Sequence, residues 1–155
     1  MADRDESEIE RLDRNWSDLL QELRVTQTGV QLLTGFLLTL PFQQRFSALD
    51  TASRNVYLAT VASAVAATAA LVAPVSTHRL LFRRHARAEM VKVGHRYAMV
   101  GLMMLGIAVT GVVDVILTLV VSDTAGYAGA GTTAALYFVV WLVVPLILRH
   151  RHGTS

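Results

Sequence analysis

Asp114 is the one acidic residue placed well inside a long apolar run of this chain. It lies seven residues from the end of that run, which corresponds to about 10 Å along a helix. An ionised carboxylate in hydrocarbon is costly without a partner. At similar depth we expect Thr39, Tyr137 and Arg45. Pairing with Arg45 would make the site structural, whereas contact with water and a hydroxyl would allow Asp114 to carry a proton.

A second set of polar side chains recurs at intervals of three and four residues in the first apolar run, so its members share one face of a helix. They are Arg24, Gln27, Thr28, Gln31 and Thr34. Amides in hydrocarbon must find partners, so this polar face predicts either hydrogen bonds between helices or a polar vestibule open to the cytoplasm. Gln31 lies about 15 Å in depth from Asp114, so the two polar clusters form separate sites.

No residue pattern in the sequence is typical of a catalytic or metal site. The chain has no cysteine, which excludes disulfides, thiolate ligands and cysteine nucleophiles. His78, His85 and His95 are scattered through an arginine-rich stretch that would repel a divalent cation. His150 and His152 stand in a basic tail without a carboxylate. HExxH, GxSxG and phosphate-cradling glycine loops are absent, so we expect no enzyme, no metal and no cofactor.

Four long apolar runs must position these side chains, in a chain of 155 residues that is 53% hydrophobic. They are Val25–Phe42, Val56–Val75, Tyr97–Val121 and Thr132–Leu148. Each is close to the roughly 20 residues that a helix needs to cross about 30 Å of hydrocarbon. The sequence therefore predicts an all-α, four-helix transmembrane bundle at 25–148, preceded by a cytoplasmic segment at 1–24 and followed by a basic tail at 149–155. The length of the third run disfavours the alternative, a soluble helical bundle.

Lys and Arg are distributed unevenly among the segments that flank the apolar runs. Of the 14, four precede the first run, six lie between the second and third runs, and two follow the fourth. The other two connections hold only Arg45 and Arg54. Positive residues stay in the cytoplasm, so both termini and the 76–96 loop are expected to face inward. The outer connection at 122–131 reads SDTAGYAGAG and is expected to be a flexible turn, although Tyr127–Ala130 could extend the fourth run.

Two stretches of the chain carry a resemblance to a known family. Arg14 to Phe46 reads RNWSDLLQELRVTQTGVQLLTGFLLTLPFQQRF, and His78 to Arg84 reads HRLLFRR. With these stretches the chain resembles an uncharacterised actinobacterial family of small four-span integral membrane proteins, some of which carry a sodium:proton antiporter label. The resemblance covers most of the chain and is densest from Asn15 to Phe46. It implies the fold and a multi-pass location in the inner membrane of a bacterium, but no mechanism.

An amphipathic helix is expected before the first apolar run. Ser7 and Glu10 have the spacing of a capping box. Apolar residues then follow at alternating intervals of three and four, the seam of a heptad pattern: Ile9, Leu12, Trp16, Leu19 and Leu23. This helix could lie on the membrane surface or pair with another helix. Residues 1–24 carry a formal charge of −4, which anionic headgroups would repel, and this favours pairing.

The 76–96 loop is the natural partner for those acids, since it holds six basic side chains and a single acid. The basic residues are Arg79, Arg83, Arg84, Arg87, Lys92 and Arg96. We expect the N-terminal helix to pack over this basic loop, in the same protomer or a neighbouring one. The alternative is that the loop meets anionic lipid headgroups. Nucleic acid is not an expected partner, because the loop has no aromatic platform or docking helix.

Small residues recur at four-residue spacing in the second and third runs, a pattern that favours close helix approach. They are Ala59, Ser63 and Ala67; Ala62, Ala66 and Ala70; Gly94 and Ala98; and Gly106 and Thr110. The sequence therefore predicts a non-catalytic integral membrane protein that acts as an oligomerising scaffold or as an accessory subunit of a membrane assembly. A small ion- or proton-coupled transporter that uses Asp114 is the second interpretation. A lipid-responsive regulator that uses the basic loop is the third.

Overall fold

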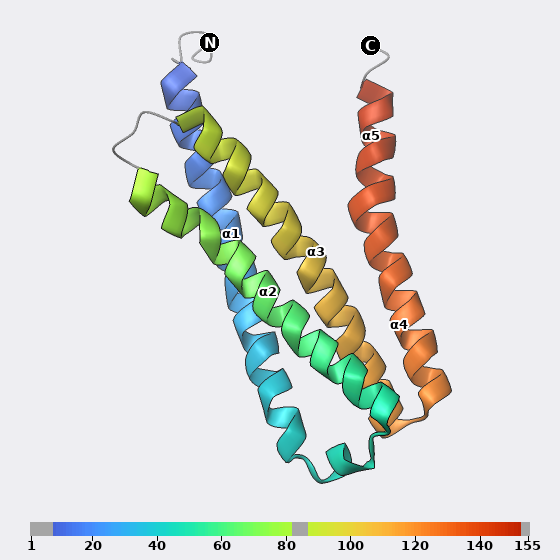
Figure 1. Cartoon of the computed structure of the whole chain (residues 1–155). Coiled ribbons are helices and arrows are strands. Elements are labelled where there is room, and N and C mark those ends of the chain that lie inside the picture. Colours follow the sequence, from blue (N-terminus) through green and yellow to red (C-terminus); the bar gives the residue numbers. More distant parts are fainter. Residues whose placement is uncertain (1–7, 82–86, 153–155) are drawn as a thin grey trace. The chain divides into compact units, whose positions relative to one another are not determined.

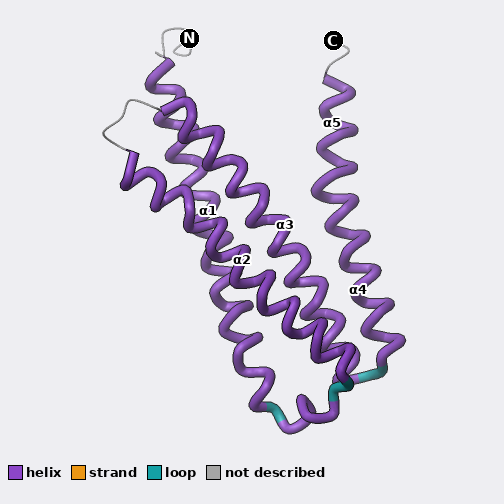
Figure 2. Tube along the Cα trace, viewed as in Figure 1, coloured by secondary structure: helices purple, strands orange, loops and turns teal. Residues whose placement is uncertain are grey.

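A computed structural model describes residues 8–81 and 87–152. These residues are helical with short connections, and none of them lies in a strand (Figures 1 and 2). The α-helices are α1 (Glu8–Thr39), α2 (Thr51–Leu81), α3 (Arg87–Val120), α4 (Asp123–Phe138) and α5 (Val144–His152). Two 3-10 turns, η1 (Leu40–Phe42) and η2 (Gln44–Ala48), connect α1 to α2, and a π-helical turn, η3 (Val139–Val143), joins α4 to α5. The predicted all-α class is confirmed for this part of the chain.

Three of the described helical segments are long and apolar enough to cross a membrane. They are Thr51–Ser76, Val93–Val120 and Asp123–Arg149. The first two lie within α2 and α3, and the third covers α4, η3 and most of α5. α1 is not among the three, since acidic and basic residues are spread along its first half.

α1 runs without a break from Glu8 to Thr39, so the expected N-terminal helix and the first apolar run form one element. Leu23, Val30 and Leu37 are buried at seven-residue intervals along it. This is the spacing of a helix that packs along a single stripe. Leu23 belongs to the expected seam, and Leu19 is partly buried. The other residues of the seam and its capping box have side chains outside the described part: Ser7, Ile9, Glu10, Leu12 and Trp16.

α2 and α3 bury residues at alternating intervals of three and four. On α2 they are Ser53, Tyr57, Thr60, Ala64, Ala67, Leu71 and Pro74. On α3 they include Gly94, Ala98, Gly101, Ala108, Val112 and Val115. Many of these residues are small, and small residues allow two helix backbones to approach closely.

The small residues singled out by four-residue spacing are only partly those that pack. Four of them are buried: Ala67, Gly94, Ala98 and Gly106. Three are partly buried: Ser63, Ala70 and Thr110. Three are exposed: Ala59, Ala62 and Ala66. A four-residue spacing drifts around a helix of 3.6 residues per turn, so one face cannot keep every member of two such rows.

By its contacts the chain divides into two units, one of residues 1–36 and 64–104 and the other of residues 37–63 and 105–155. In the first unit the side chain of Leu71 is fully buried. A Cβ atom built on Gly101 of α3 would lie 2.7 Å from Cδ2 and Cγ of Leu71. Carbon atoms do not pack that closely, so the contact between α2 and α3 in this unit depends on a glycine.

The backbone of the same α2 residue accepts a hydrogen bond from α1. Nε2 of Gln27 donates to the carbonyl oxygen of Leu71 over 2.7 Å. Pro74 lies three residues further along, inside α2 and buried. Proline has no N–H and its ring crowds the preceding turn, so carbonyl groups there become available to neighbouring helices. The Gln27 amide therefore satisfies a carbonyl in the turn that Pro74 disturbs.

In the second unit, α4 begins at Asp123, so the prediction of a flexible turn at 122–131 is wrong. Ser122 is the N-cap, and its side chain accepts a hydrogen bond from the backbone N–H of Ala125. Asp123 stands in the first turn, where a negative charge favours the helix N-terminus. The fourth apolar helix therefore starts nine residues before Thr132, the start expected from the apolar run. Gly126, Gly129 and Gly131, which suggested a turn, lie inside α4.

The π-helical turn η3 lies just before Pro145, where the proline interrupts the hydrogen bonds of the fourth apolar helix. The backbone N–H of Val144 donates to the carbonyl oxygen of Val139, five residues earlier. Pro145 follows directly and cannot donate to the carbonyl of Trp141, four residues earlier. A wider π-turn accommodates this interruption of the α-helical ladder. Helical structure is consequently continuous from residue 123 to residue 152.

Replacing Gly101 with alanine is expected to lower thermal stability, because the added methyl group meets the fully buried Leu71 and overpacking costs about 1–3 kcal/mol. Gly35→Ala is the matched control, since a Cβ atom there meets nothing within 4 Å. Alanine favours a helix over glycine by about 0.5–1 kcal/mol. Thermal unfolding in detergent should show a lower midpoint for Gly101→Ala and an unchanged or higher one for Gly35→Ala. Equal midpoints would contradict the close contact between α2 and α3.

Candidate functional site

Asp114 lies on α3 in the second unit, and only 5% of its surface is exposed. α4 covers it at a glycine. A Cβ atom built on Gly126 would lie 2.9 Å from the carbonyl oxygen of Asp114 and 3.3 Å from its Oδ1, and it would collide with Oγ1 of Thr118. Asp114 and Thr118 are four residues apart, so they lie one turn apart on the same face of α3. Gly126 therefore allows α4 to close over two polar side chains.

The Thr118 hydroxyl has no hydrogen-bond partner among the described residues. Its Oγ1 is buried and unbonded there. A buried polar group left unbonded costs about 1–3 kcal/mol. An unbonded hydroxyl one turn from a buried acid indicates a place that a proton, a water molecule or a small cation could occupy.

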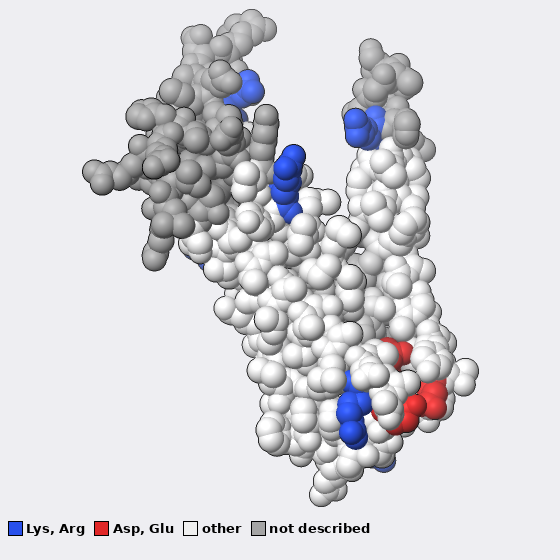
Figure 3. Space-filling view, viewed as in Figure 1, with Lys and Arg blue, Asp and Glu red and all other residues white. Residues whose placement is uncertain are grey.

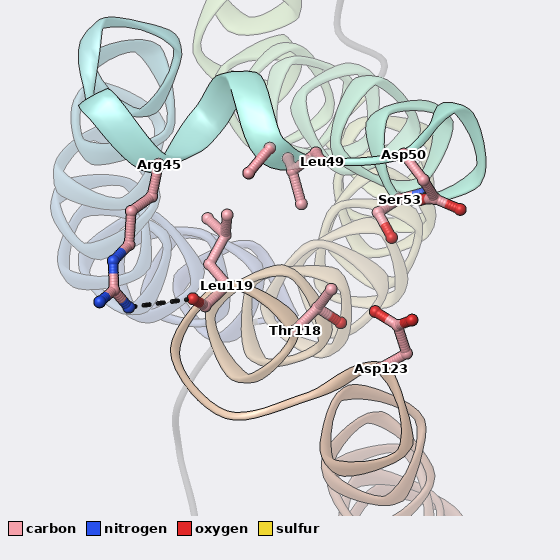
Figure 4. Close-up of a pocket in the computed structure, with 8 residues that line it drawn as sticks. Arg45, Leu49, Asp50, Ser53, Thr118, Leu119 and Asp123 are labelled. Atoms are coloured by element: carbon pink, nitrogen blue, oxygen red, sulfur yellow. Dashed lines mark hydrogen bonds between the residues drawn. The ribbon is translucent and has the colours of Figure 1, made fainter.

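A cavity of about 330 Å³ opens beside Thr118, at the ends of the helices of the second unit. It is lined by Arg45, Ala48, Leu49, Asp50, Ser53, Thr118, Leu119 and Asp123. Figure 4 shows the hydroxyl groups of Ser53 and Thr118 and the carboxylate of Asp123 turned toward the same space. Thr118 therefore links this outer cavity to the buried Asp114.

Sequence reasoning did not identify Ser53, Thr118 or Asp123. Two signals were present in the chain. Thr118 stands one helical turn after Asp114, and Asp123 follows the serine that caps α4. Ser53 gave no such signal, because only the fold brings the start of α2 to the end of α3.

Arg45 does not pair with Asp114. Its Nη1 donates to the backbone carbonyl of Leu119 over 3.3 Å, as Figure 4 shows. The last carbonyls of a helix have no partner within the helix, and a cation there also opposes the negative end of the helix dipole. Arg45 thus caps the C-terminus of α3, and of the two alternatives for Asp114 the structure does not show the ion pair with Arg45.

Tyr137 and Thr39 are the other two residues expected near Asp114. The ring of Tyr137 lies edge-on to that of Trp141, with centroids 4.6 Å apart. Both rings border Gly106, within 3.4 to 3.9 Å of where its Cβ would stand. Gly106 is eight residues before Asp114 on α3, about 12 Å along the helix. Tyr137 therefore contacts α3 well away from the acid, and Thr39 is the last residue of α1.

The polar face of the first run is satisfied mostly within α1. Oγ1 of Thr28 donates to the carbonyl of Arg24 over 3.1 Å, and Oγ1 of Thr34 donates to the carbonyl of Val30 over 2.8 Å. Gln31 is exposed. The two threonine hydrogen bonds lie within α1, whereas the Gln27 amide bonds to α2. One member of the polar face therefore joins two helices, and the choice between interhelical bonding and a polar vestibule stays a prediction.

Most of the predicted 76–96 loop is helical, since 76–81 belong to α2 and 87–96 belong to α3, and only 82–86 lie outside the described part. Arg96 is exposed on α3, whereas the side chains of the other five basic residues lie outside the described part: Arg79, Arg83, Arg84, Arg87 and Lys92. The expected packing of the N-terminal helix over this loop therefore stays a prediction. Among the described residues, no three His, Asp or Glu side chains are placed to hold a metal ion.

Asp50 is the best-partnered acid of the outer cavity. It stands directly before α2, and its Oδ1 accepts a hydrogen bond from the backbone N–H of Ser53 over 2.8 Å. This bond, with weaker ones from the Ser53 side chain and the Ala52 backbone, holds the pKa of Asp50 below its ordinary value of 3.8. Asp50 therefore acts as a charged N-cap of α2.

A charged cap with a lowered pKa makes stability depend on pH. Its contribution is complete above the ordinary pKa and is lost as the pH falls through the lowered one. Asp50→Asn keeps a capping side chain that cannot titrate, so the advantage of wild type over Asp50→Asn in thermal midpoint should shrink as the pH falls from about 5 to about 3. Asp50→Ala should be the least stable at neutral pH. A difference between wild type and Asp50→Asn that does not change with pH would contradict this role.

Comparison with known proteins places the chain in a family. A model described as a family of unknown function (DUF6328) matches residues 5–145, which include the outer cavity and all of α1 to α4. No curated protein and no solved structure matches the chain. The expected likeness to an uncharacterised family is confirmed, whereas the actinobacterial origin and the antiporter label stay predictions. The chain belongs to the family of unknown function DUF6328.

Proposed function

We propose that this chain is a non-catalytic integral membrane protein that oligomerises, or joins a larger membrane assembly, as a scaffold or accessory subunit. The observation that supports this most strongly is the exposure of its last apolar helix. The most apolar stretch of Asp123–Arg149 has 0% of its residues buried, against 28% for Thr51–Ser76 and 33% for Val93–Val120. Along most of its visible length this helix also carries no acidic or basic atoms (Figure 3). Its surface is available to lipid or to another helix.

One face of α4 has the composition of a helix-pairing surface. Small residues lie on the side opposite Gly126, and all are exposed: Thr124, Ala128, Gly131 and Ala135. A Cβ atom built on Gly131 meets nothing within 4 Å. Lipid tails compete equally well for large apolar side chains, so helices in a membrane associate where small residues let their backbones approach. We call these four residues the outward face of α4.

In this proposal α1 is the fourth membrane helix, and both termini and the basic loop lie in the cytoplasm. The distribution of Lys and Arg along the chain supports this orientation. The Gln27 bond to the Leu71 carbonyl supports placing α1 in the membrane, because an amide there needs a partner on another helix.

Substitution of Gly131 with leucine should weaken self-association in lipid at least about fivefold, since overpacking a close helix contact costs about 1–3 kcal/mol. Ala134→Leu is the control, because Ala134 is exposed on α4 but lies off the outward face. Stoichiometry can be measured by single-molecule photobleaching in lipid vesicles at several protein-to-lipid ratios. The proposal would be contradicted if wild type is monomeric and co-purifies with no other subunit. It would also be contradicted if Gly131→Leu and Ala134→Leu weaken self-association equally.

Ion or proton transport through Asp114 is the second candidate function. It is favoured by the burial of Asp114 and by the neighbouring Thr118 hydroxyl, which is buried without a hydrogen-bond partner among the described residues. Arg45 is bonded to the Leu119 carbonyl, so it does not neutralise Asp114. Thr118 also lines the outer cavity, which could serve as the entrance to such a path.

Liposome flux assays separate the two candidates. If Asp114 carries a proton or sodium ion, wild type should show flux and Asp114→Asn should lose it by an order of magnitude or more. Asp18→Asn, which removes an exposed acid from the cytoplasmic part of α1, should leave flux unchanged. Wild type that shows no flux above empty liposomes under either gradient would rule out transport by the isolated protein and leave the scaffold.

A further inference from the structure

A groove of about 500 Å³ lies between α2 and α3 in the first unit. It is lined by Ala69 and Ala70 of α2 and by Val93, Arg96, Tyr97 and Val100 of α3. The two alanines carry only a Cβ atom each, which leaves room beside the backbone of α2. The groove is apolar except for the Arg96 guanidinium and the Tyr97 hydroxyl.

The polar groups of this groove lie at one end of a membrane-spanning segment. Arg96 and Tyr97 follow Val93, the first residue of the apolar segment Val93–Val120, by three and four residues. Side chains on a helix lean toward its N-terminus, so Arg96 is directed toward the membrane surface rather than the hydrocarbon centre. Tyrosine is likewise favoured at headgroup depth. The groove therefore has a cationic mouth and an apolar floor.

We propose that this groove binds an anionic phospholipid, with an acyl chain along the alanines and valines and the headgroup phosphate at Arg96. Charge complementarity selects this occupant, because Arg96 is the only charged residue among the described side chains that line the groove. The segment that leads into α3, 76–96, has six basic residues and one acid, so anionic headgroups gather at this surface.

A second copy of the chain is the competing occupant. A helix from a second copy would need an acidic residue to pair with Arg96. The described apolar segments Thr51–Ser76, Val93–Val120 and Asp123–Arg149 contain only two acids, Asp114 and Asp123. Neither is available for this pairing. Asp123 begins the last segment next to Ser122, and Asp114 is buried. A phosphate satisfies the arginine, whereas an apolar helix offers it no partner.

Native mass spectrometry of detergent-solubilised protein titrated with phosphatidylglycerol or with phosphatidylcholine of the same acyl chains tests the proposal. Each cationic residue at a membrane surface adds about 1 kcal/mol, so Arg96→Gln should weaken phosphatidylglycerol binding about fivefold and leave phosphatidylcholine binding unchanged. Arg96→Lys keeps the charge and should retain most of the preference. Ala70→Leu fills the groove and should weaken binding of both lipids.

Arg54→Gln is the matched control, since Arg54 is an exposed arginine on α2 that does not line the groove. It should leave both affinities as in wild type. Equal phosphatidylglycerol affinities of wild type and Arg96→Gln would overturn the proposal. So would an Ala70→Leu variant that dissociates oligomers while binding both lipids normally, because the occupant would then be a second copy. These readouts do not depend on whether the outward face of α4 pairs.

Discussion

Close approach of helix backbones at glycine is the constraint on which this molecule depends. Lipid tails match leucine in polarity, so apolar side chains alone do not hold membrane helices together. Gly101 makes room for Leu71 in the first unit, and Gly111 and Gly126 make room for Thr60 and Thr118 in the second. At each point a methyl group would push two helices apart. A polar contact joins α1 to the same part of α2, where the Gln27 amide donates to the Leu71 carbonyl.

Polar groups in the structure fall into two kinds with different physical meaning. At helix ends they are satisfied: Asp50 caps α2, Ser122 caps α4, and Arg45 bonds to the last turn of α3. Beneath Gly126 the Thr118 hydroxyl is not, since it is buried without a hydrogen-bond partner among the described residues. Buried polar groups are normally bonded, so this exception separates a candidate site from capping that only stabilises the fold.

Hydrophobic runs predicted which segments are helical, and the helical rise predicted how deep each residue lies in a membrane. Neither predicts which way a side chain points around its helix axis. Depth alone put Arg45 and Tyr137 near Asp114, whereas Arg45 bonds to Leu119 and Tyr137 packs on Trp141 beside Gly106. The start of α4 was missed because glycine and alanine at 126–131 were read as turn residues. Gly126 and Gly129 are packing positions against α3, and the Ser122–Asp123 pair was the local signal of a helix N-terminus.

We propose that self-association is the first use of the outward face of α4, so that this face meets another copy of the chain. Because the chain has no cysteine, Ala135→Cys introduces one spin-label site per molecule, and any dipolar coupling must arise between molecules. Pulsed electron paramagnetic resonance in lipid vesicles at high dilution should then give a defined short distance, while the same label at Ala134→Cys should give a longer one. Absence of coupling from both sites at every dilution would contradict the claim.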